Sequence, residues 1–161
     1  MRKALFLIPF TLLAISLLVS CKEEESIIGN TGPGGGIIFY DKGEYSDGWR
    51  YLEAAPSDLD EKYSYTDAIT KCEEYSTEVK GLLYEDWYLP NAFELNLMYV
   101  NLAKEDIGVF KDFEYYWSSD KSKSDPDTKA QAIKFKKDYE AASLSKLPQS
   151  DLCNVRPIRA Y

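Results

Sequence analysis

The sequence contains no histidine, and this absence removes several classes of chemistry at once. A Ser-His-Asp or Cys-His catalytic centre, a histidine-ligated metal and a histidine pH switch all need that side chain. Basic residues are also scarce, because 19 lysines and arginines face 27 aspartates and glutamates, for a formal net charge of −8. Nucleic acids and anionic lipid surfaces select basic proteins, so we expect no nucleic-acid partner.

Cysteine is rare as well, with three in the chain, and the first of them has the most informative surroundings. Cys21 follows a basic start, an apolar run over residues 4–19 and the small residue Ser20. These are the marks of a secretory signal, and a cysteine directly after the small residue resembles the lipobox of bacterial lipoproteins. The resemblance implies that residues 1–20 are removed and that the Cys21 thiol is diacylated. A plain transmembrane anchor is the alternative, but the run is short for a span of roughly 20 apolar residues.

The expected organisation is therefore a lipoprotein signal peptide over 1–20, an acidic tether over 21–30 and one domain over 31–161. The lipid on Cys21 would hold the protein on a membrane of the bacterial cell envelope. Lys22 follows the lipidated cysteine, so the aspartate that signals inner-membrane retention in some bacteria is missing. We therefore expect an outer-membrane location.

Two cysteines remain once Cys21 is set aside, and an exported protein enters an oxidising compartment. A disulfide between Cys72 and Cys153 would close a loop of about 80 residues and stabilise the fold by roughly 4–5 kcal/mol in the chain-entropy model. Two buried free thiols, or a catalytic cysteine, are the alternatives. The catalytic alternative is weak because no histidine is present to activate a thiol.

The rest of the chain predicts short strands with two helices. Thr66 caps a predicted helix to about Glu78 whose inner face includes Cys72, and Asn91 with Glu94 forms a capping-box pattern for a second helix. The glycine-rich run over 32–36 leads into a strand, so we interpret it as a turn and not as a phosphate loop. The predicted strands cover 37–40, 49–54, 115–119, 130–135 and 155–161, with a turn at 41–43 between the first two. Few helices and many short strands, without βαβ alternation, indicate the α+β class.

Several short motifs resemble the Legionella collagen-like protein C-terminal domain family. The run Asp86-Trp87-Tyr88-Leu89-Pro90-Asn91 with Glu94-Leu95, the later Trp117-Ser118-Ser119 and the closing Val155-Arg156-Pro157-Ile158-Arg159 follow the order of that family's pattern. The resemblance implies a C-type-lectin-like fold of short antiparallel strands with two helices. In such folds a long disulfide joins the first helix to the last strand, where Cys72 and Cys153 stand. Tyr88 replaces the family's usual arginine, and the acidic charge argues against the sulfated glycans associated with the family's namesake.

Candidate binding residues lie around the loop that follows residue 119. Trp117 could stack on a sugar ring or could plug the core, and Asp120, Asp125 and Asp127 offer oxygen ligands on a loop. Calcium takes such ligands, but the EF-hand spacing is missing and lysines interleave the aspartates, so we predict no cofactor. Trp87, Leu89 and Pro90 are interpreted as core, and Arg156 and Arg159 as partners in structural ion pairs.

These observations predict a lipid-anchored, non-catalytic protein that binds a protein or glycan ligand, as an adhesion module would. A structural envelope lipoprotein that contacts only other proteins is the alternative. An enzyme like the formylglycine-generating branch of the fold would need a free reactive cysteine, and both candidate cysteines have a structural interpretation.

Overall fold

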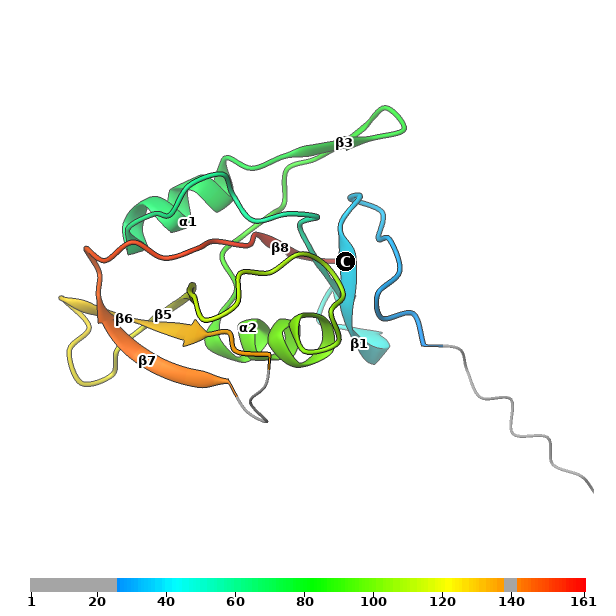
Figure 1. Ribbon diagram of the computed structural model, residues 1–161. Helices are drawn as coiled ribbons and strands as arrows, with labels where there is room; N and C mark the ends of the chain where they lie inside the picture. The colour runs from blue at the N-terminus through cyan, green and yellow to red at the C-terminus, as the bar shows by residue number, and fades with distance from the viewer. Residues whose placement is uncertain (1–25, 138–141) are drawn as a thin grey trace, which may run out of the picture.

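The computed structural model describes residues 26–137 and 142–161, so Cys21 and the signal segment lie outside the described residues. The described part is a mixed α+β fold (Figure 1) with three small antiparallel sheets. The helices are α1 (Tyr65–Glu73) and α2 (Ala92–Met98), and α2 continues into the π-helical turn η1 (Tyr99–Ala103). The strands are β1 (Ile37–Ser46), β2 (Trp49–Ala54), β3 (Thr77–Val79), β4 (Leu82–Tyr84), β5 (Tyr115–Lys121), β6 (Lys129–Lys134), β7 (Ser143–Pro148) and β8 (Ile158–Ala160).

The sheet β5-β6-β7 separates two apolar cores. Tyr116 and Ile133 face one core, which contains the buried side of α2 and the side chains of Phe39, Leu52 and Phe135. Trp117 and Ala132 face the other, which contains Tyr65, Ala68 and Cys72 from α1 together with Cys153. Adjacent residues of a strand point to opposite faces, so one short sheet buries apolar side chains on both sides. Figure 1 shows α1 and α2 on opposite sides of the chain segments that lie between them, with β8 in the middle.

The second sheet, in the order β1-β2-β8, brings the two ends of the domain together. β1 and β2 form the predicted antiparallel hairpin, and β8 pairs with β2 on the other side. The predicted turn at 41–43 is wrong, because β1 continues to Ser46 and the chain reverses at Asp47-Gly48. Both turn residues have positive φ, of 53° and 85°, as the tight turns of β-hairpins require.

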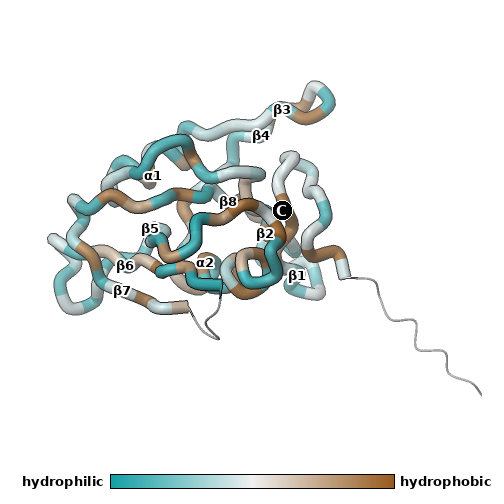
Figure 2. Tube along the Cα trace, in the orientation of Figure 1, coloured by the Kyte–Doolittle hydropathy of each residue, from teal (hydrophilic) through white to brown (hydrophobic). Residues whose placement is uncertain are grey.

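The first helix is shorter than predicted. Ser64, not Thr66, accepts the hydrogen bond from the Asp67 N–H at the start of α1, and the helix ends at Glu73. Thr77–Val79 then pairs with Leu82–Tyr84 in a hairpin that turns at Lys80-Gly81, where both φ values are positive. Val79, which continued the helical pattern, belongs to β3, and the hairpin projects from the body of the molecule (Figures 1 and 2).

The second helix begins as predicted. The Asn91 side chain accepts from the Glu94 N–H, and the Glu94 carboxylate accepts from the Asn91 N–H, which completes the capping box. Leu95, Met98 and Leu102 are fully buried, as the helical spacing indicated. This helix covers the face of β5 and β6 that carries Tyr116 and Ile133, and it stops short of covering β7, where the groove described below is found.

Candidate functional site

The predicted site residues do not gather around one centre. Trp117 is 1 % exposed, its indole N–H donates to the Tyr63 carbonyl oxygen at 2.8 Å, and its ring meets the edge of Tyr65. A sugar cannot stack on a ring that the core already covers on both faces. The ligand-binding role suggested for Trp117 is therefore wrong, and the plug interpretation is confirmed.

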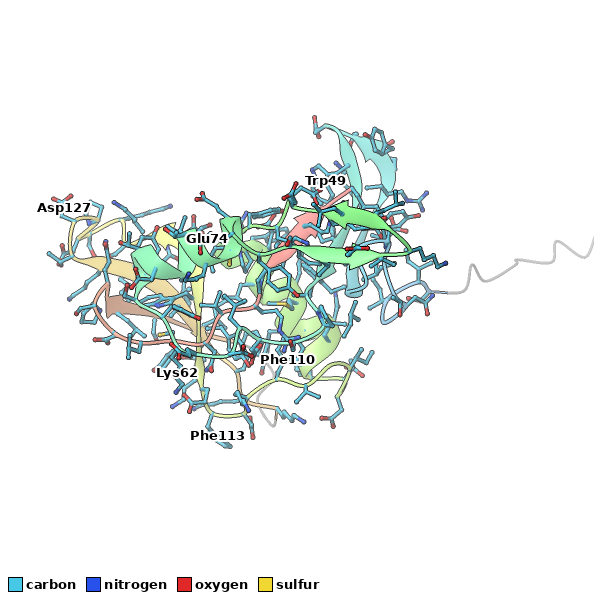
Figure 3. The ribbon with its side chains drawn as sticks, turned by 90° about the horizontal axis from the view of Figure 1, so that it is seen from above. Trp49, Lys62, Glu74, Phe110, Phe113 and Asp127 are labelled. Atoms are coloured by element: carbon cyan, nitrogen blue, oxygen red, sulfur yellow. The ribbon has the colours of Figure 1, made fainter. Side chains whose placement is uncertain are left out.

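The three aspartates have different surroundings. Asp120 Oδ2 accepts from the Ala92 N–H at 2.8 Å, which ties the end of β5 to the first turn of α2. Asp125 contributes its backbone carbonyl to the Lys129 N–H, and Asp127 lies at the outer tip of the loop, away from the body (Figure 3). Over residues 26–137 and 142–161, no three Asp, Glu, Cys or His side chains come together as a metal site would need. Of the three side chains, that of Asp120 therefore has a structural role, because it joins β5 to α2.

A groove lies beside Asp120, between the start of α2 and the edge of the sheet. Its volume is about 570 Å³, and we call it the α2–β7 groove. It is lined by Ala92, Phe93, Asp120, Lys121, Lys123, Gln131, Leu144 and Lys146.

Two exposed apolar side chains flank this groove. Phe93 on α2 is 65 % exposed, and Leu144 on β7 is 54 % exposed. Leu144 stands directly opposite buried Ile133 in the β6–β7 pairing, so it continues the α2 core outward to a surface position. Apolar side chains that extend a core onto a concave surface are typical of binding sites.

The charge of the groove is opposite to that of the whole chain. Lys121, Lys123 and Lys146 contribute three positive charges, and Asp120 is the single carboxylate in the lining. The Asp120 carboxylate already accepts a backbone hydrogen bond, whereas Lys146 makes only a long contact, of 3.4 Å, to the Ser124 hydroxyl. A basic surface on a chain of net charge −8 attracts anionic groups locally.

The most buried charged groups form two structural networks. Arg159 binds Asp86 through two hydrogen bonds of 2.8 and 2.9 Å and contacts buried Glu53 at 3.2 Å. Arg156 binds the Asp58 carboxylate and two backbone carbonyls. The ion pairs predicted for the two arginines are therefore confirmed. The carboxylates of Asp58, Asp86 and Glu53 are each engaged by an arginine, so these three groups have a structural role.

Hydrogen bonding and burial change several ionisation equilibria in these networks. The guanidinium of Arg159, bonded to Asp86, holds the pKa of that carboxyl below its usual range. Burial raises the pKa of Tyr116, whose hydroxyl donates to Asp58 at 2.7 Å. The lowered pKa keeps Asp86 ionised, as its hydrogen bonds to Arg159 require, and the raised pKa keeps the Tyr116 hydroxyl protonated, as its hydrogen bond to Asp58 requires. Both effects support a structural role for these side chains.

The two remaining cysteines belong to the core between α1 and the sheet. The structure holds Cys72 and Cys153 as free, buried thiols, without the disulfide that the sequence led us to expect. Burial raises the pKa of both thiols to about 12. A thiol with such a pKa is almost entirely protonated near neutral pH, and a protonated thiol is a poor nucleophile.

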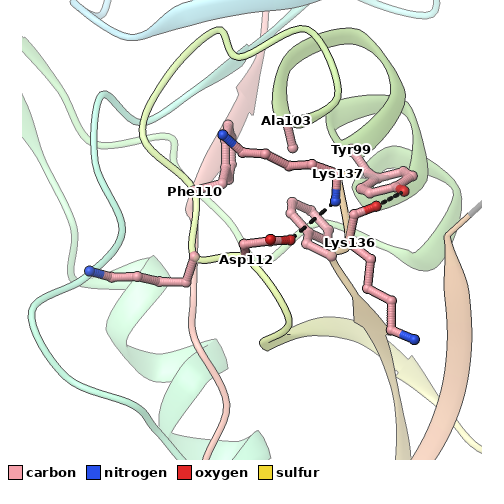
Figure 4. A pocket seen from close by; sticks show the side chains of 8 residues that line it. Tyr99, Ala103, Phe110, Asp112, Lys136 and Lys137 are labelled. Atoms are coloured by element: carbon pink, nitrogen blue, oxygen red, sulfur yellow. Dashed lines mark hydrogen bonds between the residues drawn. The ribbon is translucent and has the colours of Figure 1, made fainter. Parts of the chain in front are cut away.

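The other hollows of the described surface offer less to a ligand. The space around Phe110 and Phe135 (Figure 4) is too narrow to admit water, and hydrogen bonds from the Tyr99 hydroxyl and the Lys137 N–H close its rim. A wider hollow of about 410 Å³ separates Thr31–Pro33 from the β3–β4 hairpin and has Lys80 as its one charged residue. A smaller hollow of about 250 Å³ has Leu59 and Val109 beside Asp58, Asp60 and Lys111, but Asp58 is already bonded to Arg156. The α2–β7 groove is larger and places two exposed apolar side chains beside three lysines, so we take it as the candidate site.

Sequence reasoning missed most of this groove. Lys121 and Lys123 lie in the loop after residue 119 that was a candidate site, but they were interpreted only as neutralising its aspartates. Phe93, Leu144 and Lys146 were not predicted to bind a ligand. The alternation in Ser143-Leu144-Ser145-Lys146-Leu147-Pro148 was the available signal for a strand with one apolar and basic face.

No protein-family model matches the sequence, and no significant match is found among curated proteins. Among the described residues, no helix has the length and apolar character needed to cross a membrane.

Proposed function

We propose that this chain is a lipid-anchored protein of the bacterial cell envelope that binds a ligand, without catalysis, through the α2–β7 groove. The groove carries the proposal, because it places exposed Phe93 and Leu144 beside three lysines on an otherwise acidic domain. The mixed α+β architecture is compatible with the C-type-lectin-like fold implied by the sequence motifs. We include that fold in the proposal, with the anchor at Cys21 and an outer-membrane location.

A photo-crosslinking experiment in living cells tests the binding role. A photoreactive phenylalanine analogue is placed at Phe93, and the matched control carries it at Tyr45, which is exposed on β1, outside the groove. We expect light-dependent adducts from position 93 and none from position 45. Equal labelling from both positions, or none from position 93, would contradict a ligand in this groove.

The location is tested by protease treatment of intact cells, with a known periplasmic protein as control. Cleavage of the domain while the control survives would support an adhesion role outside the cell. Protection until the outer envelope is opened would favour the alternative, a structural lipoprotein with periplasmic protein partners. Labelling with a radioactive fatty acid, lost in Cys21→Ser, tests the anchor itself.

A further inference from the structure

The edge of the sheet beside the groove has a backbone that is open to pairing. β7 is the last strand of β5-β6-β7, and the opposite edge, β5, is already bonded through Tyr115 and Trp117 to the backbone of Asn154. Among the residues the structure describes, no further strand pairs with β7. An open edge of this kind is a template for another extended segment.

The register shows which backbone groups of β7 point outward. Gln149 donates its N–H to the Thr128 carbonyl, and the pairing continues from there as Lys129 with Pro148 and Ala130 with Leu147. Bonded and non-bonded pairs alternate along an antiparallel ladder. The N–H groups of Ser143, Ser145 and Leu147 therefore face β6.

It follows that Leu144 and Lys146 turn their N–H and C=O groups toward the free edge. Pro148 alternates with Leu144 and Lys146 along β7, so its backbone nitrogen also faces away from β6. A proline has no N–H, and at this position no hydrogen bond to β6 is lost. The side chains of Leu144 and Lys146 also line the α2–β7 groove. Open backbone groups and groove side chains thus belong to the same two residues.

Resting on the proposed binding function, we propose that the ligand is an acidic, extended protein segment that adds to β7 as an antiparallel strand. Antiparallel is the direction of each pairing between the named strands β1 to β8, and the one parallel contact described is the isolated bridge between Tyr116 and Asn154. Side chains on one face of the added strand lie next to Leu144 and Lys146, since neighbouring strands are about 4.8 Å apart. An acidic side chain there meets Lys146, Lys121 and Lys123, and an apolar one meets Leu144 and Phe93.

Charge complementarity favours this occupant over a second copy of the chain. If the β7 edges of two copies paired with each other, the lysines of the two grooves would lie close together and repel. β7 contains no acidic residue that could neutralise them. An acidic segment neutralises those lysines and gains backbone hydrogen bonds. In this mode of recognition the backbone supplies affinity and alternate side chains supply specificity.

The test uses the full-length protein in detergent and a fluorescent peptide, Glu-Thr-Leu-Thr-Glu-Thr-Leu-Thr, followed by fluorescence anisotropy at low salt. Its Glu and Leu side chains share one face, so they reach the groove together. We expect binding that is weakened about tenfold or more by the triple variant Lys121→Glu/Lys123→Glu/Lys146→Glu, since the attraction between the two peptide glutamates and the lysines is replaced by repulsion. The matched control is Lys111→Glu, which reverses an exposed lysine outside the groove and should bind the peptide unchanged.

Two modified peptides test the backbone pairing without altering the protein. Methylation of the Glu and Leu amide nitrogens removes the N–H groups that face Leu144 and Lys146 in an antiparallel pair, so binding should be lost. Methylation of the Thr nitrogens modifies the outer edge only, so binding should persist. Equal loss with both peptides, or with neither, overturns strand addition.

The remaining outcomes separate this proposal from the proposed function. Binding of a polygalacturonate oligomer at the same lysines, without peptide binding, overturns the protein-segment ligand and keeps the groove as a site. Self-association that the triple variant abolishes, without peptide binding, would mean that a second copy occupies the groove. Absence of crosslinks from Phe93 in cells, together with absence of peptide binding, removes both proposals.

Discussion

The carboxylate of Glu53 lies 3.2 Å from the guanidinium of Arg159, and both side chains are buried against the glycine-rich turn over 32–36. Glu53 also accepts the N–H groups of Gly34 and Gly36 at 3.1 and 2.6 Å. One buried carboxylate therefore joins the N-terminal turn, β2 and the C-terminal strand β8. The backbone N–H groups of the glycine-rich run therefore bind the Glu53 carboxylate, a side chain of the protein itself.

Replacing Glu53 with alanine should destabilise the domain strongly. The change leaves two buried N–H groups without their acceptor and removes one of the two acidic partners of Arg159. Breaking a buried charge pair in this way costs about 3–5 kcal/mol. The measurement is the free energy of unfolding from urea titration. Lys111→Ala, at an exposed position, is the control and should stay within about 0.5 kcal/mol of the unmodified protein; a similar small effect for Glu53→Ala would contradict the network.

Gly36→Ala should also destabilise the domain, for a steric reason. A Cβ at this position would lie 2.1 Å from the Ala54 carbonyl oxygen, so β1 and β2 would have to separate locally. We expect a loss of about 3 kcal/mol in the free energy of unfolding. Gly81→Ala provides the comparison, because it has positive φ but open space around its Cβ, and it should cost about 1 kcal/mol. Equal costs would mean that the crowding at Gly36 is relieved by movement of the chain.

Local sequence signals predicted some of this fold well. Asn91 and Glu94 are three residues apart, so the capping box that begins α2 was visible in the sequence and is present in the structure. The same holds for β2 over Trp49–Ala54. The end of α1 was missed because Val79 fits the helical spacing, whereas the positive φ values at Lys80-Gly81 draw it into a hairpin.

The site was harder to predict because its residues come from separate elements. Phe93 on α2, Lys121 on β5 and Lys146 on β7 approach one another only after the sheet has formed. Whether a tryptophan is covered also depends on distant contacts, and Trp117 is covered by Tyr65, which is 52 positions earlier in the numbering. Composition could show that the chain is acidic, but not that its lysines cluster.

Trp117→Ala is expected to unfold or greatly weaken the domain instead of removing a ligand contact. Deleting a buried tryptophan costs about 3–5 kcal/mol, and the Tyr63 carbonyl loses one of its two hydrogen bonds while keeping that from the Cys153 N–H. Trp117→Phe keeps most of the apolar volume and should cost less. The measurement is thermal unfolding of both variants, with anisotropy of the acidic peptide on each variant that folds. Normal stability of Trp117→Ala combined with lost binding would return Trp117 to the site.

The thiols of Cys72 and Cys153 should be unreactive in the folded protein. Burial and a pKa of about 12 keep both protonated and covered at pH 8. After reduction and removal of the reductant, we expect no alkylation of Cys72 or Cys153 by iodoacetamide in the folded state and alkylation of both after unfolding, assigned by mass spectrometry of the two peptides. Rapid labelling of either thiol in the folded protein would contradict the buried arrangement.

The disulfide predicted from the sequence is tested by the same alkylation measurement on protein that has not been reduced. A sample extracted from the envelope and unfolded without reductant would show no free thiol at these two positions if the bridge forms in the cell. Two free thiols there would agree with the structure and would leave the long loop unconstrained.

The buried tyrosines should make the protein sensitive to alkaline pH. Burial raises the pKa of Tyr161 to about 12, and it also raises the pKa values of Tyr65, Tyr75, Tyr88, Tyr99 and Tyr116. An unfolded tyrosine ionises near pH 10. The folded state therefore keeps these hydroxyls protonated, and the stability this provides is complete below about pH 10 and is lost as the pH rises toward the folded-state pKa values.

We accordingly expect absorbance at 295 nm to show a late group of tyrosinates that appears together with loss of the near-ultraviolet circular dichroism signal. Tyr161→Phe is the informative variant, because no hydrogen bond of the Tyr161 hydroxyl is found among the described residues and the ring contacts with Tyr51 and Arg159 are kept. Removing a group that favours the unfolded state at high pH should move alkaline unfolding to a higher pH. If all tyrosines titrate near pH 10 while the fold persists, or if Tyr161→Phe unfolds at the same pH as the unmodified protein, then burial of these hydroxyls does not control alkaline stability.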